Sequence, residues 1–565
     1  MERTKNKNFR SSELRLCTLS GTEEVGRNCN FLELGDEIVI IDAGYAFPGH
    51  EMYGIDYLIP NIKYLRKNKH KVKAILITHG HLDHTGALRW ILPELDFPPI
   101  YAGAFAKALI EAKLEEHNLK QKTKIYGVTR HTTINIGRNF KATFIGINHS
   151  IPDAFSIFID TPKGNVFFSG DYKIDAQPTS ELEADYSKLR SLRGRVDLAL
   201  MESTNASTPG KAPSETEVSR NLEGVIQKVQ GRVIVASFSS LLTRLHSLFE
   251  IAKRTNRKIV LSGRSLEQSI SIAHNQRYIN IPEGLIIKER DMPKYKDNEL
   301  LVLSTGSQGE RFAALNRISL NEHKYIKIKK GDLVIMSSSE IPGNITSIER
   351  MTDRLIALGA DLIKDSIETK IHSTGHGNQE DMKIMYDLVR PKKVLPIHGP
   401  LTFRYFNKKN YIEWGMRPED VLLTKDGQVW TYNGQYWRKD KEIESKPILI
   451  DGLGVGDTGE IVLKDRQQLA EYGMFTVVLN LSQKSKSLIG RPHFVSRGFI
   501  YMKASQEILK EIETIIFDIH RSWAKKSQQS KKFEIKELKE NIEKSLSKFI
   551  FKKTEREPII LVVVV

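Results

Sequence analysis

Short apolar runs that end in turn or polar residues recur along the first part of the chain, and this pattern predicts strands. We expect them at residues 14–19, 30–34, 37–41, 72–77, 143–150, 165–168 and 198–201. Helical spacing of apolar positions covers residues 57–67 and 85–92. Asp42, His149, Asp171 and Glu202 lie at the ends of four of these runs. The region therefore reads as α/β, with polar side chains at strand ends, where such folds usually place their chemistry.

A Thr/Pro/Gly/Ser-rich stretch at residues 204–214 predicts a linker, and the pattern changes after it. Helices are expected at 215–229, 241–254 and 266–275, and strands at 233–238, 259–261, 300–303 and 333–337. This alternation is typical of a doubly wound parallel sheet. Its strand ends carry Ser239, Ser240 and the loop from Ser304 to Gly309, small residues that let backbone N–H groups approach a phosphate.

A second histidine group at His372 and His376 is followed by an apolar run at 394–397 and then His398, so we expect the chain to return to the first domain there. A Gly-rich stretch at 452–459 predicts the start of a C-terminal domain. That domain reads as strand 475–481, helices 506–519 and 535–550, and strand 559–565. The last run is apolar throughout, so it must pair inside a sheet or at a subunit interface. The predicted segments are 1–207, 208–368, 369–450 and 451–565.

The stretch from Thr78 to Gly86 holds three histidines and an aspartate within six positions, directly after a predicted buried strand. Buried imidazoles each need a polar partner, which makes a packing role hard to sustain. On a turn, His79 and His81 can face one way while Asp83 and His84 face another, so one loop could serve two adjacent cations. The alternative is a surface loop that happens to be rich in histidine. A loop this short cannot complete two coordination spheres, so further ligands must come from elsewhere.

Composition, charge and cysteine content add to this picture. The chain has 565 residues, 40% of them hydrophobic and 27% charged, which predicts a globular, soluble protein of several domains. Its formal charge of +16 favours a polyanionic partner over charge that serves solubility alone. Cys17 and Cys29 are the only cysteines, so a metal site must use histidine and carboxylate ligands. Residues 1–10 form a basic, arm-like start without the apolar core of a signal peptide, and no run is long enough to span a bilayer. We expect a cytoplasmic protein with no membrane partner.

These motifs resemble a known family. Asp42, the loop from His79 to His84, His149 and Asp171 resemble the successive metal-site motifs of the metallo-β-lactamase fold. Glu202, the inserted domain, His376 and His398 resemble the β-CASP branch of that fold, and residues 14–565 are similar to the bacterial ribonuclease J family. The resemblance implies a metallo-β-lactamase αββα sandwich with an inserted doubly wound β-CASP domain and a small α+β C-terminal domain.

Carried over residue by residue, the resemblance implies two Zn²⁺ per subunit, with Mn²⁺ or Mg²⁺ as other candidates. One zinc would be held by His79, His81 and His149, and the other by Asp83, His84 and His398, with Asp171 bridging. Asp42 and Glu202 would not bind metal themselves but would orient the residues that do. Asp83 and His376 are the expected catalytic residues. RNA would be bound by a loop and two hydroxyls, namely His372, Ser373, Thr374, Gly375 and His376 with Ser239 and Ser240.

The sequence departs from the family pattern at two places. Thr374 stands where the family usually has serine, which keeps a hydroxyl. Pro400 and Leu401 follow His398 where Glu-Tyr is usual, which leaves open how that histidine is held.

The resemblance implies a zinc-dependent ribonuclease with 5′-to-3′ exonuclease and endonuclease activity that leaves 5′-phosphate products. Its expected roles are rRNA processing and mRNA decay, as a homodimer or homotetramer through the C-terminal domain, with other RNA-decay proteins as partners. Two alternatives remain. A small-molecule hydrolase of the same fold would need neither the insertion nor the second histidine group, and a non-catalytic RNA-binding subunit would not need a complete ligand set.

Overall fold

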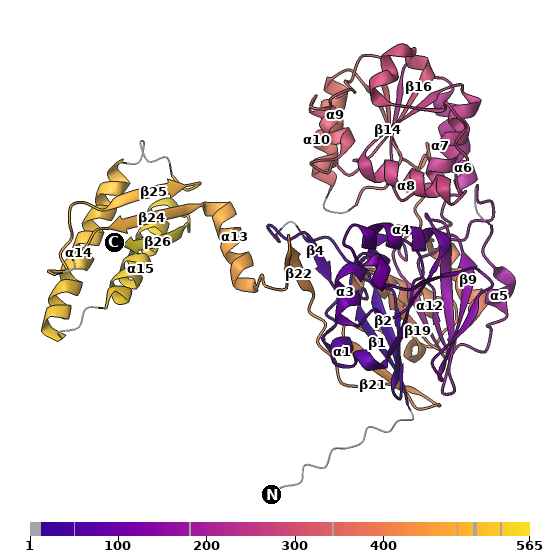
Figure 1. Ribbon diagram of the computed structural model, residues 1–565, viewed down its shortest axis with the longest axis horizontal. Coiled ribbons are helices and arrows are strands. Elements are labelled where there is room, and N and C mark those ends of the chain that lie inside the picture. Colours follow the sequence, from indigo (N-terminus) through magenta and orange to yellow (C-terminus); the bar gives the residue numbers. More distant parts are fainter. Residues whose placement is uncertain are drawn as a thin grey trace, which may run out of the picture. The chain divides into compact units, whose positions relative to one another are not determined.

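The computed structural model describes residues 13–49, 51–179, 182–341, 344–482, 484–500, 506–530 and 534–565 (Figure 1). The basic arm expected at residues 1–10 lies outside these ranges. Two compact units form: one runs up to Phe47 and continues over Leu58–Ile448, and the other combines Pro48–Tyr57 with Leu449–Val565. The boundaries at 207, 368 and 450 stay predictions. Each unit is described by itself.

The first unit contains a sandwich of two sheets. One sheet has eight strands in the order β21-β20-β1-β2-β3-β5-β6-β7. Their bounds are β1 Leu14–Ser20, β2 Cys29–Leu34, β3 Glu37–Ile41, β5 Val72–Leu76, β6 Ile100–Gly103, β7 Ile125–Val128, β20 Gln428–Tyr432 and β21 Trp437–Lys439. β3, β5, β6 and β7 run parallel, so their carboxyl ends lie along one edge. The loop from Thr78 to Gly86 leaves that edge after β5.

The other sheet has six strands in the order β19-β12-β11-β10-β9-β8. Their bounds are β8 Thr133–Ile136, β9 Phe140–Ile147, β10 Ala154–Asp160, β11 Val166–Phe168, β12 Leu198–Glu202 and β19 Val394–Ile397. β11, β12 and β19 are parallel neighbours although β19 lies almost two hundred residues later. The chain therefore returns to the first domain after the insertion, as expected.

Both faces of this second sheet are buried. Phe144 packs between the two sheets, whereas the next residue, Ile145, packs under the outer helices, as the two-residue period of a strand requires. The outer helices on this side are α5 Tyr186–Arg190, α11 Gln379–Val389 and α12 Leu401–Glu413. The helices of the first-sheet half are α1 Lys63–Lys67, α2 Leu82–Thr85, α3 Leu88–Glu94 and α4 Ala104–Glu115. The expected αββα sandwich is confirmed.

Two helix predictions in this half were wrong in part. Residues 57–67 form a short strand, β4 Tyr57–Ile59, before α1 begins. Pro60 lies between them; it favours an extended residue before it and cannot donate a helical hydrogen bond. The helix expected at 85–92 is divided into α2 and α3, because the N–H of Ala87 donates to the carbonyl of Ala43 instead of continuing the helix.

The inserted domain is a six-stranded, fully parallel sheet in the order β15-β14-β16-β13-β17-β18. Its strands are β13 Val233–Ala236, β14 Lys258–Ser262, β15 Ile286–Ile287, β16 Leu300–Ser304, β17 Leu333–Met336 and β18 Asp361–Lys364. Its helices are α6 Glu215–Ile226, α7 Leu242–Arg254, α8 Arg264–Asn275, α9 Ala314–Ser319 and α10 Ile345–Ala357. Val235 packs on one face and Ile234 on the other, so both faces are covered and the predicted doubly wound sheet is confirmed.

The second unit contains a three-stranded sheet in the order β25-β24-β26 with two long helices. Its elements are β22 Ile448–Asp451, β23 Gly454–Val455, α13 Glu460–Tyr472, β24 Met474–Leu479, β25 His493–Arg497, α14 Gln506–Ser530, α15 Ile535–Thr554 and β26 Ile559–Val564. The terminal apolar run pairs in parallel with β24, as predicted. Its other edge has no strand partner among the described residues, which leaves β26 at the border of the sheet. None of the helices described is long and apolar enough to cross a membrane.

Candidate active site

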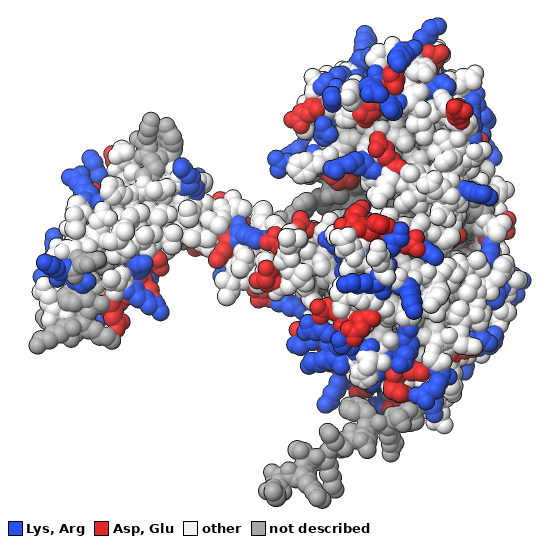
Figure 2. Space-filling model, viewed as in Figure 1, with Lys and Arg blue, Asp and Glu red and all other residues white. Residues whose placement is uncertain are grey.

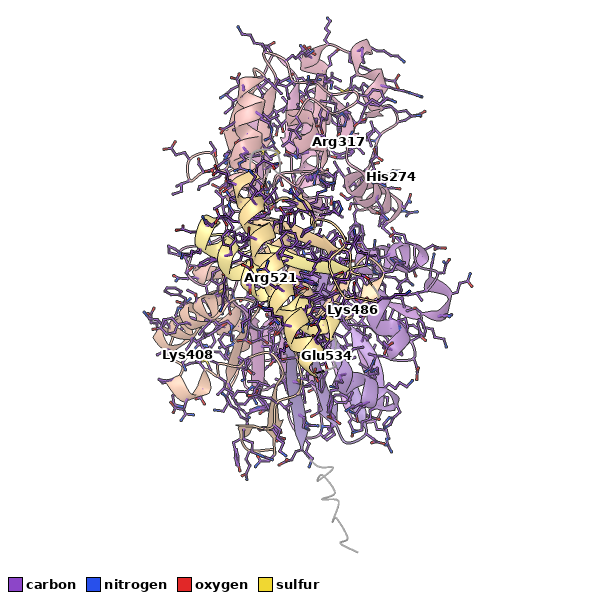
Figure 3. All side chains as sticks on the ribbon, turned by 90° about the vertical axis from the view of Figure 1, so that its left-hand side faces the viewer. His274, Arg317, Lys408, Lys486, Arg521 and Glu534 are labelled. Carbon is purple, nitrogen blue, oxygen red and sulfur yellow. The ribbon has the colours of Figure 1, made fainter. Side chains whose placement is uncertain are left out.

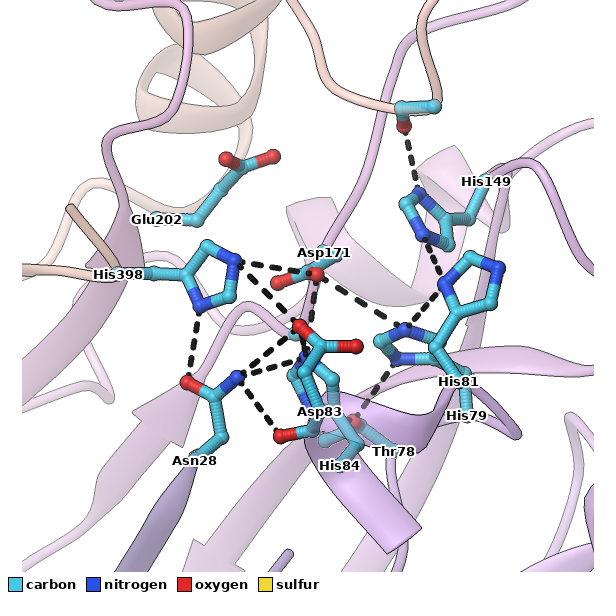
Figure 4. A network of polar contacts seen from close by, with 12 residues as sticks. Asn28, Thr78, His79, His81, Asp83, His84, His149, Asp171, Glu202 and His398 are labelled. Carbon is cyan, nitrogen blue, oxygen red and sulfur yellow. Dashed lines mark hydrogen bonds and ion pairs between the residues drawn. The ribbon is translucent and has the colours of Figure 1, made fainter. Parts of the chain in front are cut away.

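Three imidazole nitrogens from two strand ends converge on one point. His79 and His81 follow β5, and His149 follows β9. The Nδ1 atom of His81 lies 3.1 Å from His79 Nε2 and 3.0 Å from His149 Nε2 (Figure 4). Burial lowers the pKa of all three histidines, that of His81 to about 4. The rings are therefore neutral and present lone pairs to one another.

A second cluster lies beside the first and contains Asp83, His84, Asp171 and His398. Asp171 Oδ2 is 3.1 Å from His84 Nε2 and 3.5 Å from His398 Nε2, and it is also 3.8 Å from His79 Nε2 in the first cluster (Figure 4). Burial by itself lowers the pKa of His84, but the carboxylates of Asp171, Asp83 and Asp42 outweigh it and raise that pKa well above its usual value. The negative charge that raises it also attracts cations, and Asp171 places a carboxylate oxygen near both clusters.

The spacing of these atoms fits metal ligation. Three neutral imidazoles cannot all satisfy one another by hydrogen bonds, yet their nitrogens lie 3.0–3.1 Å apart. Tetrahedral zinc with a Zn–N bond of about 2.05 Å separates its nitrogen ligands by about 3.3 Å. The Nε2 atom of His398 is buried and has no hydrogen-bond partner among the described residues. The donor set of both clusters therefore fits a dinuclear centre.

The backbone around Asp42 explains how the second cluster is held. Asp42 follows β3 in the left-handed region, with φ of 62°, and is buried. Its carboxylate accepts hydrogen bonds of 2.8 Å each from the Thr78 N–H, the Thr78 hydroxyl and His84 Nδ1–H. The last bond fixes the tautomer that leaves His84 Nε2 facing the cluster. Two residues on, a Cβ at Gly44 would lie 1.6 Å from the Asp83 carbonyl oxygen, so only glycine fits there.

Asn28 is a site residue that the sequence patterns did not indicate. Its Oδ1 accepts a 2.9 Å hydrogen bond from His398 Nδ1–H, and its Nδ2 lies 3.0 Å from His84 Nε2 and 3.1 Å from the Asp83 carbonyl oxygen. It directly precedes β2 rather than following a strand, and a lone asparagine after Gly-Arg carries no signal of its own. This contact also answers how His398 is held: Asn28 orients its ring, while Pro400 serves as the N-cap residue of α12.

His376 and Glu202 form a pair next to the clusters. The Nδ1–H of His376 donates to both carboxylate oxygens of Glu202, at 3.1 and 3.2 Å. The Glu202 oxygens are themselves held by the N–H groups of Tyr172 and Thr204. Burial lowers the pKa of His376, but Glu202 outweighs it and raises that pKa to about 9. The imidazole therefore carries a proton at its other nitrogen near neutral pH. Its ring lies 5.1 Å from that of His149, beside the first cluster.

The loop from His372 to His376 packs tightly against the first cluster. The Gly375 carbonyl accepts a 2.6 Å hydrogen bond from His149 Nδ1–H, and a Cβ at Gly375 would lie 2.6 Å from the His149 ring. His372 and Ser373 are buried, and the Ser373 hydroxyl donates to the Pro213 carbonyl. Thr374 and His376 are the side chains of this loop that remain partly exposed.

A buried ionic network joins this loop to the inserted domain. Arg244 is fully buried; it pairs with Glu215 at 3.1 Å and donates to the carbonyl of Ile371, directly before the loop. Glu215 also pairs with Lys173 at 3.1 Å, and Lys173 reaches the Ser373 hydroxyl at 3.3 Å. Lys173 also lies 3.5 Å from the buried Asp175, so two cations face two carboxylates at the junction of the two domains. Removing any one of the four would leave a buried charge without its partner.

Ser239 and Ser240 lie in the turn between β13 and α7, half-buried. Within the described part of the chain their hydroxyls make no hydrogen bond, so they are available to a ligand. The ends of the neighbouring strands β16 and β17 lie beside this turn. The Ser237 N–H donates to the Ser304 carbonyl at 3.2 Å, and the Ser337 N–H donates to the Ala236 carbonyl at 2.9 Å. The predicted site residues thus fall into two groups, one around the metal clusters and one at the strand ends of the inserted domain. Their individual roles stay predictions.

Comparisons with known proteins agree with this arrangement. Residues 22–191 match the metallo-beta-lactamase superfamily, residues 230–355 the beta-CASP domain of ribonuclease J, and residues 461–565 the ribonuclease J C-terminal domain. A solved structure of a protein of unknown function from Enterococcus faecalis has a TM-score of 0.52 and 14% identity, and the match covers 74% of this chain and all of that one. The last likeness supports the fold alone.

Fold and site together define a metal-dependent nuclease of the metallo-β-lactamase fold with an inserted β-CASP domain. Ribonuclease J 1 of Streptococcus pyogenes is 36% identical over 557 residues, and ribonuclease J 2 of Staphylococcus epidermidis is 34% identical over 556 residues; each match covers 98% of both chains. The chain belongs to the ribonuclease J family, and its substrate is RNA. This membership decides against the small-molecule hydrolase, and the complete ligand set argues against a non-catalytic subunit.

Proposed function

We propose that the centre holds two zinc ions, the first on His79, His81 and His149 and the second on Asp83, His84 and His398, with Asp171 shared. Mixed imidazole and carboxylate donors suit zinc, and the short nitrogen separations in the first cluster support a small tetrahedral ion. Mn²⁺ or Mg²⁺ are the competing occupants; Mg²⁺ prefers octahedral oxygen ligands, which a cluster of three imidazoles does not offer. Metal analysis of the purified protein by mass spectrometry tests the assignment.

The reaction is hydrolysis of an RNA phosphodiester in which the P–O3′ bond breaks and the new 5′ end keeps the phosphate. When bound, two cations lower the pKa of a water near them and stabilise charge on the phosphoryl oxygens. Asp83, the partly exposed carboxylate of the second cluster, accepts the proton that this water loses. His376 donates a proton from Nε2 to the departing 3′ oxygen, while Glu202 holds its Nδ1–H and its orientation. Thr374 is placed to contact a phosphate oxygen.

Recognition of the 5′ end is assigned to the strand ends of the inserted domain. Ser239, Ser240 and the loop from Ser304 to Gly309 offer hydroxyls and backbone N–H groups to a terminal monophosphate, which carries more charge than an internal diester. A triphosphate is too large for such a pocket. The enzyme therefore trims monophosphorylated RNA from the 5′ end and also cuts internally, independent of the 5′ end.

The observation that carries this proposal is the pair of clusters joined through Asp171, with the hydrogen-bonded pair of His376 and Glu202 beside them. The test is digestion of an internally and 3′-labelled RNA that bears either a 5′ monophosphate or a 5′ triphosphate, with products resolved by length. We expect mononucleotides from the monophosphate RNA alone and rarer internal fragments from both. Equal trimming of the two RNAs would refute the pocket while leaving the metal mechanism intact.

Ser240→Glu sharpens this test, because it sets a negative charge beside the bound phosphate. We expect trimming to fall by about tenfold or more while internal cutting changes little, in line with the cost of opposed charges. Ser187→Glu is the matched control: Ser187 is exposed in the first turn of α5, where an acidic residue is well tolerated. Equal loss of both activities in Ser240→Glu would mean that the serine supports the fold rather than the 5′ end.

We assign the C-terminal domain to assembly as a homodimer or homotetramer. The border strand β26 leaves one apolar edge without a partner among the described residues, and Leu561 on it is exposed. Such an edge is stabilised by pairing with another strand. Leu561→Glu should lower the mass seen in sedimentation, whereas Ile489→Glu, an exposed position in the same domain, should not. An unchanged mass in Leu561→Glu would refute this assignment.

The cellular role follows from this activity: processing of rRNA and decay of mRNA in the cytoplasm, together with other RNA-decay proteins. On the face shown in Figure 2, positive charge is spread among acidic residues rather than gathered in one patch. Depletion of the protein should lengthen mRNA half-lives and leave 5′-extended rRNA precursors.

A further inference from the structure

One face of helix α12 is exposed, aromatic and basic. Leu401, Tyr405 and Phe406 are 61%, 53% and 38% exposed, and the two rings meet edge to face at 6.1 Å. Lys409 is exposed in the next turn, and Lys408 lies beside it at the outside of this part of the molecule (Figure 3). These five residues are called the α12 face. A group of large exposed side chains on one helix calls for a partner.

The opposite side of the same helix is anchored behind the active site. Asn407 Nδ2 donates to the Glu202 carbonyl at 2.9 Å and to the Ser203 hydroxyl at 3.0 Å, and Asn410 Nδ2 donates to the Ala206 carbonyl at 2.8 Å. Tyr411 is fully buried under the second sheet. The helix cannot rotate to bury its aromatic side chains, so the α12 face is a fixed platform.

The charge of this platform suits a polyanion. Helix α12 contains Arg404, Lys408 and Lys409 against one acidic residue, the exposed Glu413 at its C-terminal end. In the described part of the protein neither lysine forms an ion pair, so both charges are available. Glu23 pairs with Arg404 of this helix at 3.6 Å, and the neighbouring Glu24 pairs with Arg27 at 2.6 Å.

The position of the face in the chain links it to the metal centre. Leu401 follows the ligand His398 by three residues, which limits their separation to about 10 Å. An RNA that extends beyond the nucleotides at the metal clusters is therefore long enough to reach α12.

We propose that the α12 face binds single-stranded RNA outside the catalytic cleft, with bases stacked on Tyr405 and Phe406 and phosphates held by Lys408 and Lys409. Aromatic rings flanked by cations form sequence-tolerant platforms for single strands. A protein partner is less well matched, because lysine is depleted in protein interfaces. The proposal rests on the ribonuclease function and adds to it a contact that acts on long RNAs only.

The test compares a 5-nucleotide and a 20-nucleotide RNA with the zinc-loaded, full-length enzyme. Binding is measured by fluorescence anisotropy with phosphorothioate RNAs that resist cleavage, and kcat/KM with ordinary RNAs. We expect Tyr405→Ala/Phe406→Ala to weaken binding of the 20-mer by about ten- to hundredfold, as for removal of base stacking, and to leave the 5-mer unchanged in both assays. In Lys408→Ala/Lys409→Ala the affinity for the 20-mer should fall less steeply as salt is added. The slope of log affinity against log salt concentration should shrink by about 0.7 for each phosphate that a lysine no longer neutralises.

Lys324→Ala/Tyr325→Ala is the matched control, since Tyr325 is exposed with Lys324 over its ring at 4.9 Å, close to the chain entry into β17. It should bind both RNAs like the wild type.

Unchanged binding of the 20-mer in the α12 variants would overturn the proposal. Equal losses on both RNA lengths would also overturn it, because α12 would then support the active site instead. A lower mass in sedimentation with unchanged RNA affinity would identify the face as a contact between copies instead. Failure of the wild type to cleave the 5-mer would count against the catalytic mechanism, while the anisotropy of the 20-mer still decides this proposal.

Discussion

Replacing Asp42 by asparagine tests how the second ligand cluster is held. Asparagine keeps the shape of the side chain, but one of its two terminal groups is an NH₂ donor. The Asp42 carboxylate accepts from the Thr78 N–H, the Thr78 hydroxyl and His84 Nδ1–H. In Asp42→Asn the remaining oxygen can keep the backbone bond, and the NH₂ group must then face the other two donors. The His84 ring can respond only by moving its proton to Nε2, the nitrogen that faces the metal.

The size of the effect follows from these contacts. A hydrogen bond between an imidazole and a carboxylate contributes about 1.5–3 kcal/mol, and each 1.4 kcal/mol is a factor of about ten. Asp42→Asn should therefore lower the affinity for the second metal by about ten- to hundredfold, the range found for such supporting residues. The described residues of the first cluster form no hydrogen bond with Asp42, so one metal per subunit should be retained.

The assay is metal retention against a graded series of chelator concentrations, with RNA cleavage measured on the same samples. Asp36→Asn is the control, because Asp36 is exposed and pairs with Arg138 at 3.3 Å, away from the clusters. Thermal unfolding of both variants separates ligand loss from misfolding. If the folded Asp42→Asn variant retained two metals as firmly as the wild type does, another residue would have to set the tautomer of His84.

Three further predictions concern other parts of the site. His81→Ala and Asp171→Ala should each lose metal and at least about 100-fold in activity; two metals at full activity would disprove the dinuclear assignment. His376→Ala should keep both metals but lose about 10²- to 10⁴-fold in turnover, and loss of zinc instead would make His376 a ligand. Burial and the neighbouring Arg244 lower the pKa of His372 to about 3, so the folded protein holds this ring neutral while the unfolded chain protonates it below about pH 6.5. Stability should fall as the pH drops from about 6.5 towards 3, and His372→Asn should flatten that fall in melting temperature; an unchanged slope would contradict it.

Much of the site could be predicted from the sequence because its ligands come at the ends of apolar strands. Asp42, His149 and Asp171 each follow such a run, and a strand that is buried on both faces is visible as a continuous apolar segment. The histidine loop after β5 carries four potential donors within a few residues. Local periodicity and ligand chemistry are properties of short segments, so one sequence suffices to read them. For the same reason the α/β character of the first domain and the doubly wound insertion could be predicted, whereas the αββα sandwich was implied by the resemblance to the metallo-β-lactamase fold.

Only the tertiary structure decided how these segments meet. Asn28 lies in the site because β2 pairs beside β3, which brings its amide to His398 and His84 from a position with no local signal. The inward turn of Ser373 and the buried network of Lys173, Glu215 and Arg244 arise from contacts between residues up to two hundred positions apart. The exposed face of α12 is likewise invisible in its sequence, because its pattern of aromatic and basic residues does not say which side the sheet covers. The sequence determined which side chains can do chemistry; long-range packing determined which of them lie close enough to do it together.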